Sequence, residues 1–148
     1  MEDAEVLFGI YCPPHPQPLL SPDANHGYSK LRAAFETCRE RIEQSDADLL
    51  IVYSTTWPSI IGHQIQAHPE PEWVHVDDDF HYLGSMPYKF KMDVDFADCL
   101  VESAKSRGLH SRTIAYDGFP IDTGSVVALK LLNPDNRIPA VSYTHLTL

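Results

Sequence analysis

Two continuous apolar runs with an amphipathic stretch between them dominate the first third of the chain. Residues 6–11 and 49–53 are apolar runs of strand length, a pattern typical of strands that are buried on both faces. The stretch between them carries apolar residues at steps of three and four, which form one stripe of a helix: Leu31, Phe35, Cys38 and Ile42. We therefore predict a strand, helix, strand unit with parallel strands and a right-handed crossover.

Two further helices are predicted in the second half of the chain, each with a capping side chain at its start. One begins at Asp93 or Asp95 and ends at Gly108, and the other begins at Asp122 or Thr123. Aspartate and threonine are favoured at this position because their side-chain oxygens accept hydrogen bonds from the free N–H groups of the first turn.

Strands are predicted at residues 113–116 and 137–141, which alternate with these helices. Residues 54–90 are rich in Pro, His and Asp, and no period in them places an element. Alternating strands and helices predict an α/β fold, in which a mostly parallel or mixed central sheet is flanked by helices within a single domain.

Composition narrows the range of partners. Eleven basic residues against twenty-one acidic ones give a net charge of -10, which disfavours nucleic acid as a partner because no basic stripe is left to neutralise phosphates. No apolar run approaches the ~20 residues of a membrane-spanning helix, and the three cysteines form no CxxC pair. We expect a cytoplasmic protein without membrane or nucleic-acid partners.

The loops that follow the predicted strands are the place to look for a site, because open parallel sheets bind ligands beyond the carboxyl ends of their strands. These loops carry His15, residues 54–57 with His63, and residues 117–124. Nucleotide-binding, zinc-protease and serine-hydrolase motifs such as GxGxxG, HExxH and GxSxG do not occur in the sequence.

Two histidines on neighbouring loops are an arrangement that one metal ion would need. His15 and His63 are such a pair, with Asp122 or one carboxylate of residues 77–79 as a third ligand. The alternative is that both histidines are hydrogen-bonded loop residues and that residues 77–79 form a solvated acidic loop. Trp57 is interpreted as a packing residue, with a stacking platform as the alternative. Asp122 is interpreted as a helix cap, with an acid/base group as the alternative.

Several stretches at these loops resemble the class III extradiol ring-cleavage dioxygenases, and among them the two-subunit enzymes that cleave 2-aminophenol. The matching stretches lie between about residues 6 and 141, and the last is the most specific: residues 50–57 with 62–64, residues 84–90, and residues 118–125 continuing through 131–134. The resemblance implies a mixed α/β sheet domain, aromatic substrates with adjacent hydroxyl or amino groups, and O2 as the co-substrate.

The resemblance also implies where non-haem Fe(II) would be held. In the family's catalytic subunits the ligands are a His in the loop after the first strand, a His directly before the Trp that follows the second strand, and a Glu near the C-terminus. Here the residue before Trp57 is Thr56. The position equivalent to the first His ligand falls on or beside Pro14, and His15 follows it by one residue in the sequence. We therefore expect no intact iron site, with His15 as the remaining metal candidate.

This departure predicts the non-catalytic subunit of an extradiol-type dioxygenase, which pairs with a homologous iron-bearing subunit that opens catechol-like or 2-aminophenol-like rings. The expected pocket is formed by residues of the three loops: His15, Thr56, Trp57, Asp122 and Thr123. His63 is expected beside the site, as a hydrogen-bond donor or acid/base group. The alternatives are a self-sufficient Fe(II) dioxygenase with rearranged ligands, and a ligand-binding or scaffold module of the same fold.

The resemblance to the family does not extend to the final residues of the chain. Residues 142–148 do not resemble the family's continuation. We expect residues 1–141 to be the N-terminal part of an extradiol dioxygenase-like domain, followed by an atypical tail that results from truncation or from an artefact.

Overall fold

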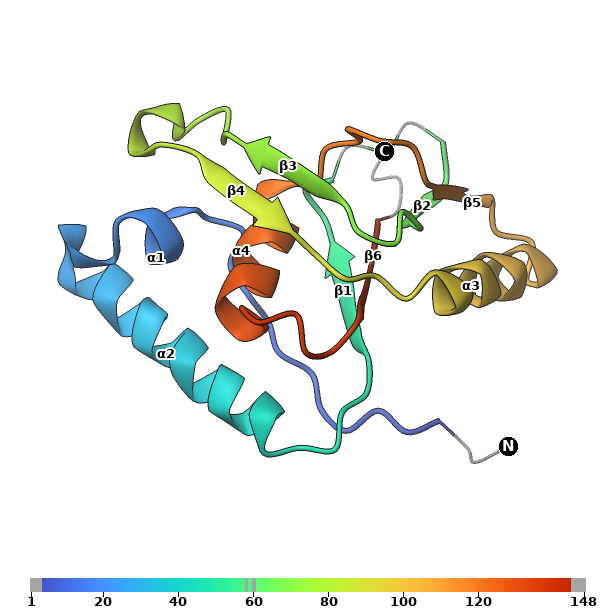
Figure 1. Cartoon of the computed structure of the whole chain (residues 1–148), viewed down its shortest axis with the longest axis horizontal. Helices are drawn as coiled ribbons and strands as arrows, with labels where there is room; N and C mark the ends of the chain where they lie inside the picture. The colour runs from blue at the N-terminus through green and yellow to red at the C-terminus, as the bar shows by residue number, and fades with distance from the viewer. Residues whose placement is uncertain (1–3, 58, 60, 145–148) are drawn as a thin grey trace.

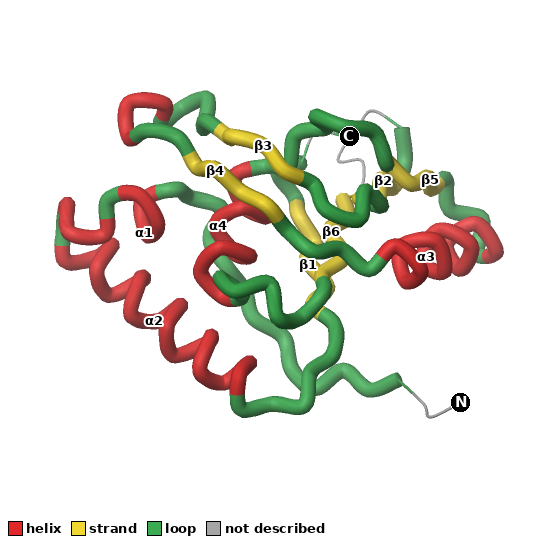
Figure 2. Tube along the Cα trace, in the orientation of Figure 1, coloured by secondary structure: helices red, strands yellow, loops and turns green. Residues whose placement is uncertain are grey.

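The computed structural model describes residues 4–57, 59 and 61–144, which form two small sheets with helices packed around them (Figure 1). The helices and strands follow one another in this order: α1 Gln17–Leu20, η1 Pro22–Ala24, α2 His26–Glu43, β1 Leu50–Ser54, β2 His63–Gln66, β3 Glu72–His75, η2 His81–Leu83, β4 Met86–Lys89, α3 Val94–Ser106, β5 Ser111–Ile114, α4 Thr123–Leu132 and β6 Ala140–Thr144. Figure 2 shows how much of the described chain is loop between these elements. No helix in the described ranges is long and apolar enough to cross a membrane.

The larger sheet is mixed, which confirms the predicted α/β class. Its four strands among the described residues lie in the order β1-β6-β2-β5. Strand β6 runs parallel to β1, with Leu50 opposite Ala140, and antiparallel to β2, with Ile65 opposite Tyr143; β5 runs parallel to β2. Strands β1 and β5 therefore run in opposite directions.

The three predicted helices are confirmed, and each begins at a capping side chain. Asn25 accepts a hydrogen bond from the backbone N–H of Tyr28 at the start of α2. Asp93 accepts from Phe96 at the start of α3, and Asp122 does the same for Ser125 at the start of α4. These bonds satisfy donors of the first turn that have no partner within the helix.

The prediction of a first strand at residues 6–11 is wrong. This segment is irregular, and Val6 and Tyr11 are 86% and 94% exposed. The parallel neighbour of β1 is β6 instead, and Val141 of β6 is fully buried. The apolar segment packs Phe8 under the guanidinium of Arg41 on α2, 4.7 Å from the ring centroid. The predicted strand, helix, strand unit at the start of the chain is therefore not formed.

The remaining strands are shifted or new. Predicted strands at 113–116 and 137–141 correspond to β5 and β6, each displaced by two or three residues. Residues 54–90, which no period could place, contain β2 and the β3–β4 hairpin, in which Trp73 lies opposite Tyr88. Residues 142–144 of the predicted tail belong to β6, and the rest of that tail lies outside the described residues.

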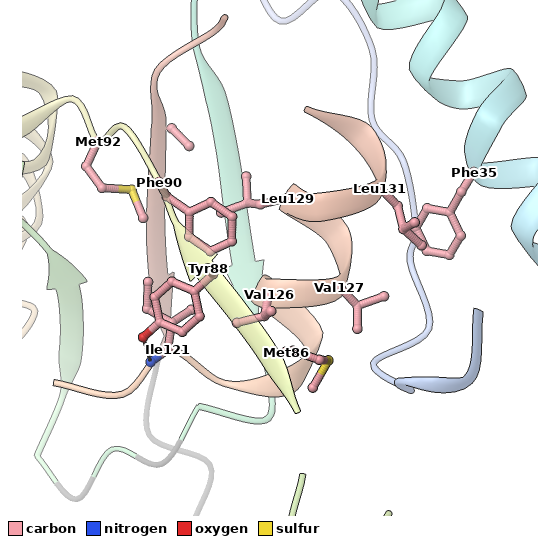
Figure 3. Packing of buried hydrophobic residues seen from close by; sticks show 11 residues of the cluster. Phe35, Met86, Tyr88, Phe90, Met92, Ile121, Val126, Val127, Leu129 and Leu131 are labelled. Carbon is pink, nitrogen blue, oxygen red and sulfur yellow. Dashed lines mark hydrogen bonds between the residues drawn. The ribbon is translucent and has the colours of Figure 1, made fainter. Parts of the chain in front are cut away.

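Helix α4 lies at the centre of the main core. Figure 3 shows its Leu129 beside Phe90 of the hairpin segment and its Leu131 facing Phe35 of α2. The second core cluster gathers Ile65 and Val141 of the sheet against Ala97 and Val101 of α3. Because α4 is apolar on most of its surface and buried over most of its length, the position of its first turn is fixed by packing from several sides.

Candidate functional site

The first turn of α4 gathers the loops that the sequence singled out. Asp122, the N-cap residue, is 8% exposed and accepts hydrogen bonds from segments far apart in the sequence. One carboxyl oxygen, Oδ2, accepts from Ser54 Oγ at 2.8 Å, Thr56 Oγ1 at 2.7 Å and the backbone N–H of Ser125 at 3.1 Å. The other, Oδ1, accepts from Ser125 Oγ at 2.7 Å. This carboxyl group joins the loop after β1 to α4.

Each hydroxyl around Asp122 has a single proton, so the direction of every bond can be assigned. Ser54, Thr56 and Ser125 all donate their protons to the carboxyl oxygens. The 3.2 Å contact between Ser125 Oγ and Ser142 Oγ must therefore be donated by Ser142, which lies on β6. Ser54 Oγ accepts in turn from the backbone N–H groups of Thr56 and Trp57. The network connects β1, β6 and α4 in one set of satisfied polar groups.

The first loop reaches the same place through Pro14. A Cβ atom added to Gly124 would lie 2.9 Å from Pro14 Cβ and 3.1 Å from Asp122 Oδ2. The absence of a side chain at Gly124 lets the Pro14 ring lie directly against the start of α4. The position before Trp57 therefore contacts the Asp122 carboxyl group, and Pro14 lies against the same first turn of α4.

The hairpin contributes a second polar cluster beside the first. Thr123 Oγ1 donates to Asp77 Oδ2 and lies 2.8 Å from His75 Nε2. Because the single hydroxyl proton of Thr123 is used on Asp77, His75 Nε2 must be the donor in its own contact with Thr123. The resulting His75, Thr123, Asp77 chain fixes the end of β3 to the first turn of α4.

The charge of Asp77 is stabilised by this arrangement. Its burial raises the pKa, but the bond from Thr123, two backbone N–H bonds from Phe80 and Asp79, and the nearby His75 together lower the pKa of Asp77 below its ordinary value of 3.8. The net effect is a carboxylate that is ionised at neutral pH and that accepts hydrogen bonds from three donors held in place by the fold.

Trp57 lies behind the network. Its side chain is 3% exposed and packs against Phe119, with ring centroids 5.4 Å apart. Its carbonyl accepts a hydrogen bond from Thr144 Oγ1 at 3.2 Å, while its indole N–H has no partner among the residues that the structure describes. Packing is therefore the role that its surroundings support.

The two candidate histidines lie in separate surroundings. The exposed ring of His15 meets Phe80 edge to face, with centroids 6.1 Å apart. His63 begins β2, where its backbone N–H donates to the carbonyl of His110 at 2.7 Å and its Nδ1 lies 3.4 Å from the same oxygen. Within the described ranges, no group of three or more His, Cys, Asp or Glu side chains is placed to hold a metal ion.

Four of the six site residues predicted from the sequence therefore meet at one place: Thr56, Trp57, Asp122 and Thr123. His15 follows Pro14 in the sequence, at the edge of the place where these four residues meet. The role expected for His63 stays a prediction. Sequence reasoning missed His75, which lies in the stretch without a period, and Ser142, since a lone serine carries no spacing signal. Asp77, one of the carboxylates that the sequence offers as a metal ligand, is the hydrogen-bond partner of Thr123.

The donor set at this place does not fit Fe(II). The metal prefers imidazole and carboxylate ligands, and the residue before Trp57 offers a neutral hydroxyl that already donates its proton to Asp122. Pro14 has no donor atom in its side chain. The hydrogen bonds at this place satisfy a buried carboxyl group and, with the Pro14 contact, hold three loops in fixed positions.

Comparison with known proteins gives the same family. Residues 9–148 match the family model described as the catalytic LigB subunit of aromatic ring-opening dioxygenase. The chain is 32% identical over 127 residues to the 2-aminophenol 1,6-dioxygenase alpha subunit of Pseudomonas sp, covering 86% of this chain and 46% of that protein. It is 28% identical over 150 residues to the beta subunit, covering 96% and 49%.

A more distant relative is the 3,4-dihydroxyphenylacetate 2,3-dioxygenase of Escherichia coli, 23% identical over 125 residues, which cover 82% of this chain and 45% of that protein. The chain thus spans about half the length of the curated relatives it matches. Since the family model covers nearly all of its residues, the chain belongs to the family of the LigB subunit of aromatic ring-opening dioxygenases.

Proposed function

We propose that this chain is the non-catalytic partner subunit of an extradiol-type dioxygenase, working with a homologous subunit that carries Fe(II) and opens catechol-like or 2-aminophenol-like rings. Similarity to both the alpha and the beta subunit of one dioxygenase supports a two-subunit assembly. It also means that those two subunits resemble each other over this stretch, so the partner would have the same fold.

The observation that carries the proposal is the bond from Thr56 to Asp122. The family resemblance expects an imidazole at the position of Thr56, whereas the Thr56 hydroxyl lies 2.7 Å from Asp122 Oδ2 and donates to it. A neutral threonine hydroxyl is a poor replacement for an imidazole as a ligand of Fe(II). At the other expected position, Pro14 packs against Gly124.

The role of these residues in such a complex is to hold loops in place. Thr56 and Asp122 use their polar atoms on each other, and Thr123 uses its hydroxyl on Asp77 and His75. The hydroxyl network therefore supplies the rigidity that a metal ion and its ligands give a catalytic subunit, and the ring-opening chemistry belongs to the partner.

Metal analysis of a defined complex tests the proposal. This chain would be co-expressed with the catalytic homologue encoded in the same genome, and iron would be measured in the complex and in each chain purified alone under anaerobic conditions. We expect stoichiometric iron with the homologue and none with this chain. Iron bound at one equivalent by this chain alone would refute the partner role, as would the lack of any homologue with His before the equivalent Trp.

A further inference from the structure

Residues 115–120 form a strap that crosses from the end of β5 towards the start of α4, drawn in orange in Figure 1. No residue of the strap belongs to a helix or strand. Inside it, the Phe119 N–H donates to the carbonyl of Tyr116 over a long 3.4 Å. Directly after it, the Ile121 N–H donates to the Tyr88 hydroxyl at 3.2 Å. A segment with fixed ends and few backbone bonds between them can open without unfolding the rest of the chain.

The strap covers the buried indole ring of Trp57. The ring of Phe119 lies on Trp57 with centroids 5.4 Å apart, and Tyr116 meets Phe119 edge to face at 5.2 Å. The neighbouring Gly118 approaches the hairpin, because a Cβ atom there would lie 3.7 Å from the ring of Trp73. Trp57 is only 3% exposed, whereas Tyr116 is 60% exposed. Movement of the strap into solvent would therefore uncover part of the Trp57 ring.

A side-chain contact holds the middle of the strap. His68 Nε2 lies 2.8 Å from Asp117 Oδ1. Because His68 Nδ1 accepts from the backbone N–H of Glu70 at 3.2 Å, the ring proton is on Nε2, which donates to Asp117. The Asp117 side chain is 99% exposed, and polar contacts so open to water contribute little to stability. The strap is therefore held closed by a weak contact.

The closed strap lies beside two buried N–H donors that have no partner in the part of the chain that the structure describes. They are Trp57 Nε1 and Gln66 Nε2, in side chains that are 3% and 1% exposed. Gln66 lies opposite Ile114, where the strap leaves the sheet, and its side chain points away from α3 because that of Ile65 packs against α3. A buried donor without an acceptor costs free energy that contact with water removes. These donors therefore oppose the closed position.

We propose that the strap opens as a unit over Trp57 and that the contact between His68 and Asp117 holds it closed. Ring packing favours the closed state and the unpartnered donors oppose it, so a weak polar contact is enough to shift the balance. The Asp122 network stays in place when the strap opens, since its bonds come from β1, the loop after β1, and α4. The strap thus controls the access of solvent to Trp57, beside that network, whatever the function of the chain.

Acrylamide quenching of tryptophan fluorescence tests the proposal, because the chain has two tryptophans. All variants are made in a Trp73→Phe background, in which Trp57 is the sole emitter. Asp117→Ala removes the acceptor for His68 and should raise the quenching rate constant of Trp57 about two- to fivefold. Asp117→Asn keeps an acceptor oxygen and should raise it less. Asp135→Ala is the matched control, since it removes an exposed aspartate from the loop after α4, and it should leave quenching unchanged.

Circular dichroism and thermal unfolding of each variant separate movement of the strap from loss of fold. A folded Asp117→Ala chain with an unchanged quenching rate constant would overturn the role of the contact. Phe119→Ala keeps that contact and removes the ring that covers Trp57, so it should also raise quenching. A folded Phe119→Ala chain without this increase would show that the strap does not cover Trp57. Quenching that rises in urea only together with global unfolding would show that the strap does not open by itself.

Discussion

The hydroxyl of Thr56 donates a hydrogen bond to the carboxyl group of Asp122 at 2.7 Å, between residues 66 positions apart. Ser54 and Ser125 donate to the same group. Few polar groups in the described structure connect as many segments, so the surrounding loops depend on one side chain for their relative placement.

Replacing Asp122 with Ala should lower the free energy of unfolding by about 2–4 kcal/mol, because the change removes a helix cap and leaves buried hydroxyls without an acceptor. Asp93→Ala is the matched control, since Asp93 caps α3 through a single bond to the Phe96 N–H, and it should cost about 1 kcal/mol. Urea unfolding measures both. Equal losses would mean that the hydroxyls around Asp122 contribute nothing beyond the cap.

Gly124→Ala should destabilise the chain by about 1–3 kcal/mol, because the new methyl group would meet Pro14 and force the first loop away. Gly27→Ala is a close control. Gly27 and Gly124 both occupy the second position of a helix, and a Cβ at either would lie 3.1 Å from the capping side chain, Asn25 or Asp122; only Gly124 also meets a proline. Thermal unfolding should separate the two variants, and similar melting temperatures would contradict the close approach of Pro14.

The stabilising effect of Asp77 should depend on pH. Its pKa is lowered in the folded chain, so its contribution to stability is complete above the unfolded value of about 4 and is lost as the pH falls through the folded pKa. Asp77→Asn should therefore be less stable than the original chain at pH 7, and the difference should shrink below about pH 4. Urea unfolding at pH 7, 5 and 3.5 measures this, with the exposed neighbour variant Asp78→Asn as control. A difference that stays constant with pH would exclude the ionised Asp77 as its source.

The cysteines should differ in reactivity. Burial, and secondly the nearby Cys38, raise the pKa of the Cys12 thiol to about 11, so at pH 8 hardly any of it is in the reactive thiolate form. Cys99 is exposed on α3. Iodoacetamide at pH 8 followed by mass spectrometry should show Cys99 alkylated well before Cys12, and the order should vanish in urea. Rapid labelling of Cys12 in the folded chain would show that the first loop is not packed as described.

The helices could be predicted from the sequence because their signals are local. The steps of three and four from Leu31 to Ile42, and the caps at Asp93 and Asp122, lie within the segments that they define. Strand pairing is different, since an apolar run such as residues 6–11 indicates a tendency to be buried and says nothing about its neighbour. The parallel neighbour of β1 turned out to be β6, from the far end of the described chain.

The candidate site was predicted in part for a reason that does not hold. The loops after β1 and β5 were expected to meet at one edge of a parallel sheet, yet these two strands run in opposite directions. They meet because residues 115–121 cross back to the first turn of α4, where Phe119 reaches Trp57. His75 could not be foreseen, because its role depends on a hairpin that has no regular pattern in the sequence.

Strand β6 lies between β1 and β2, and its Ala140 pairs with Leu50. During synthesis β1 and β2 leave the ribosome long before the strand that will separate them. Closing so long a loop is entropically costly and slow, so the larger sheet cannot assemble stepwise from neighbouring hairpins. Until β6 arrives, the inner edges of β1 and β2 remain open to wrong pairing with each other or with other nascent chains.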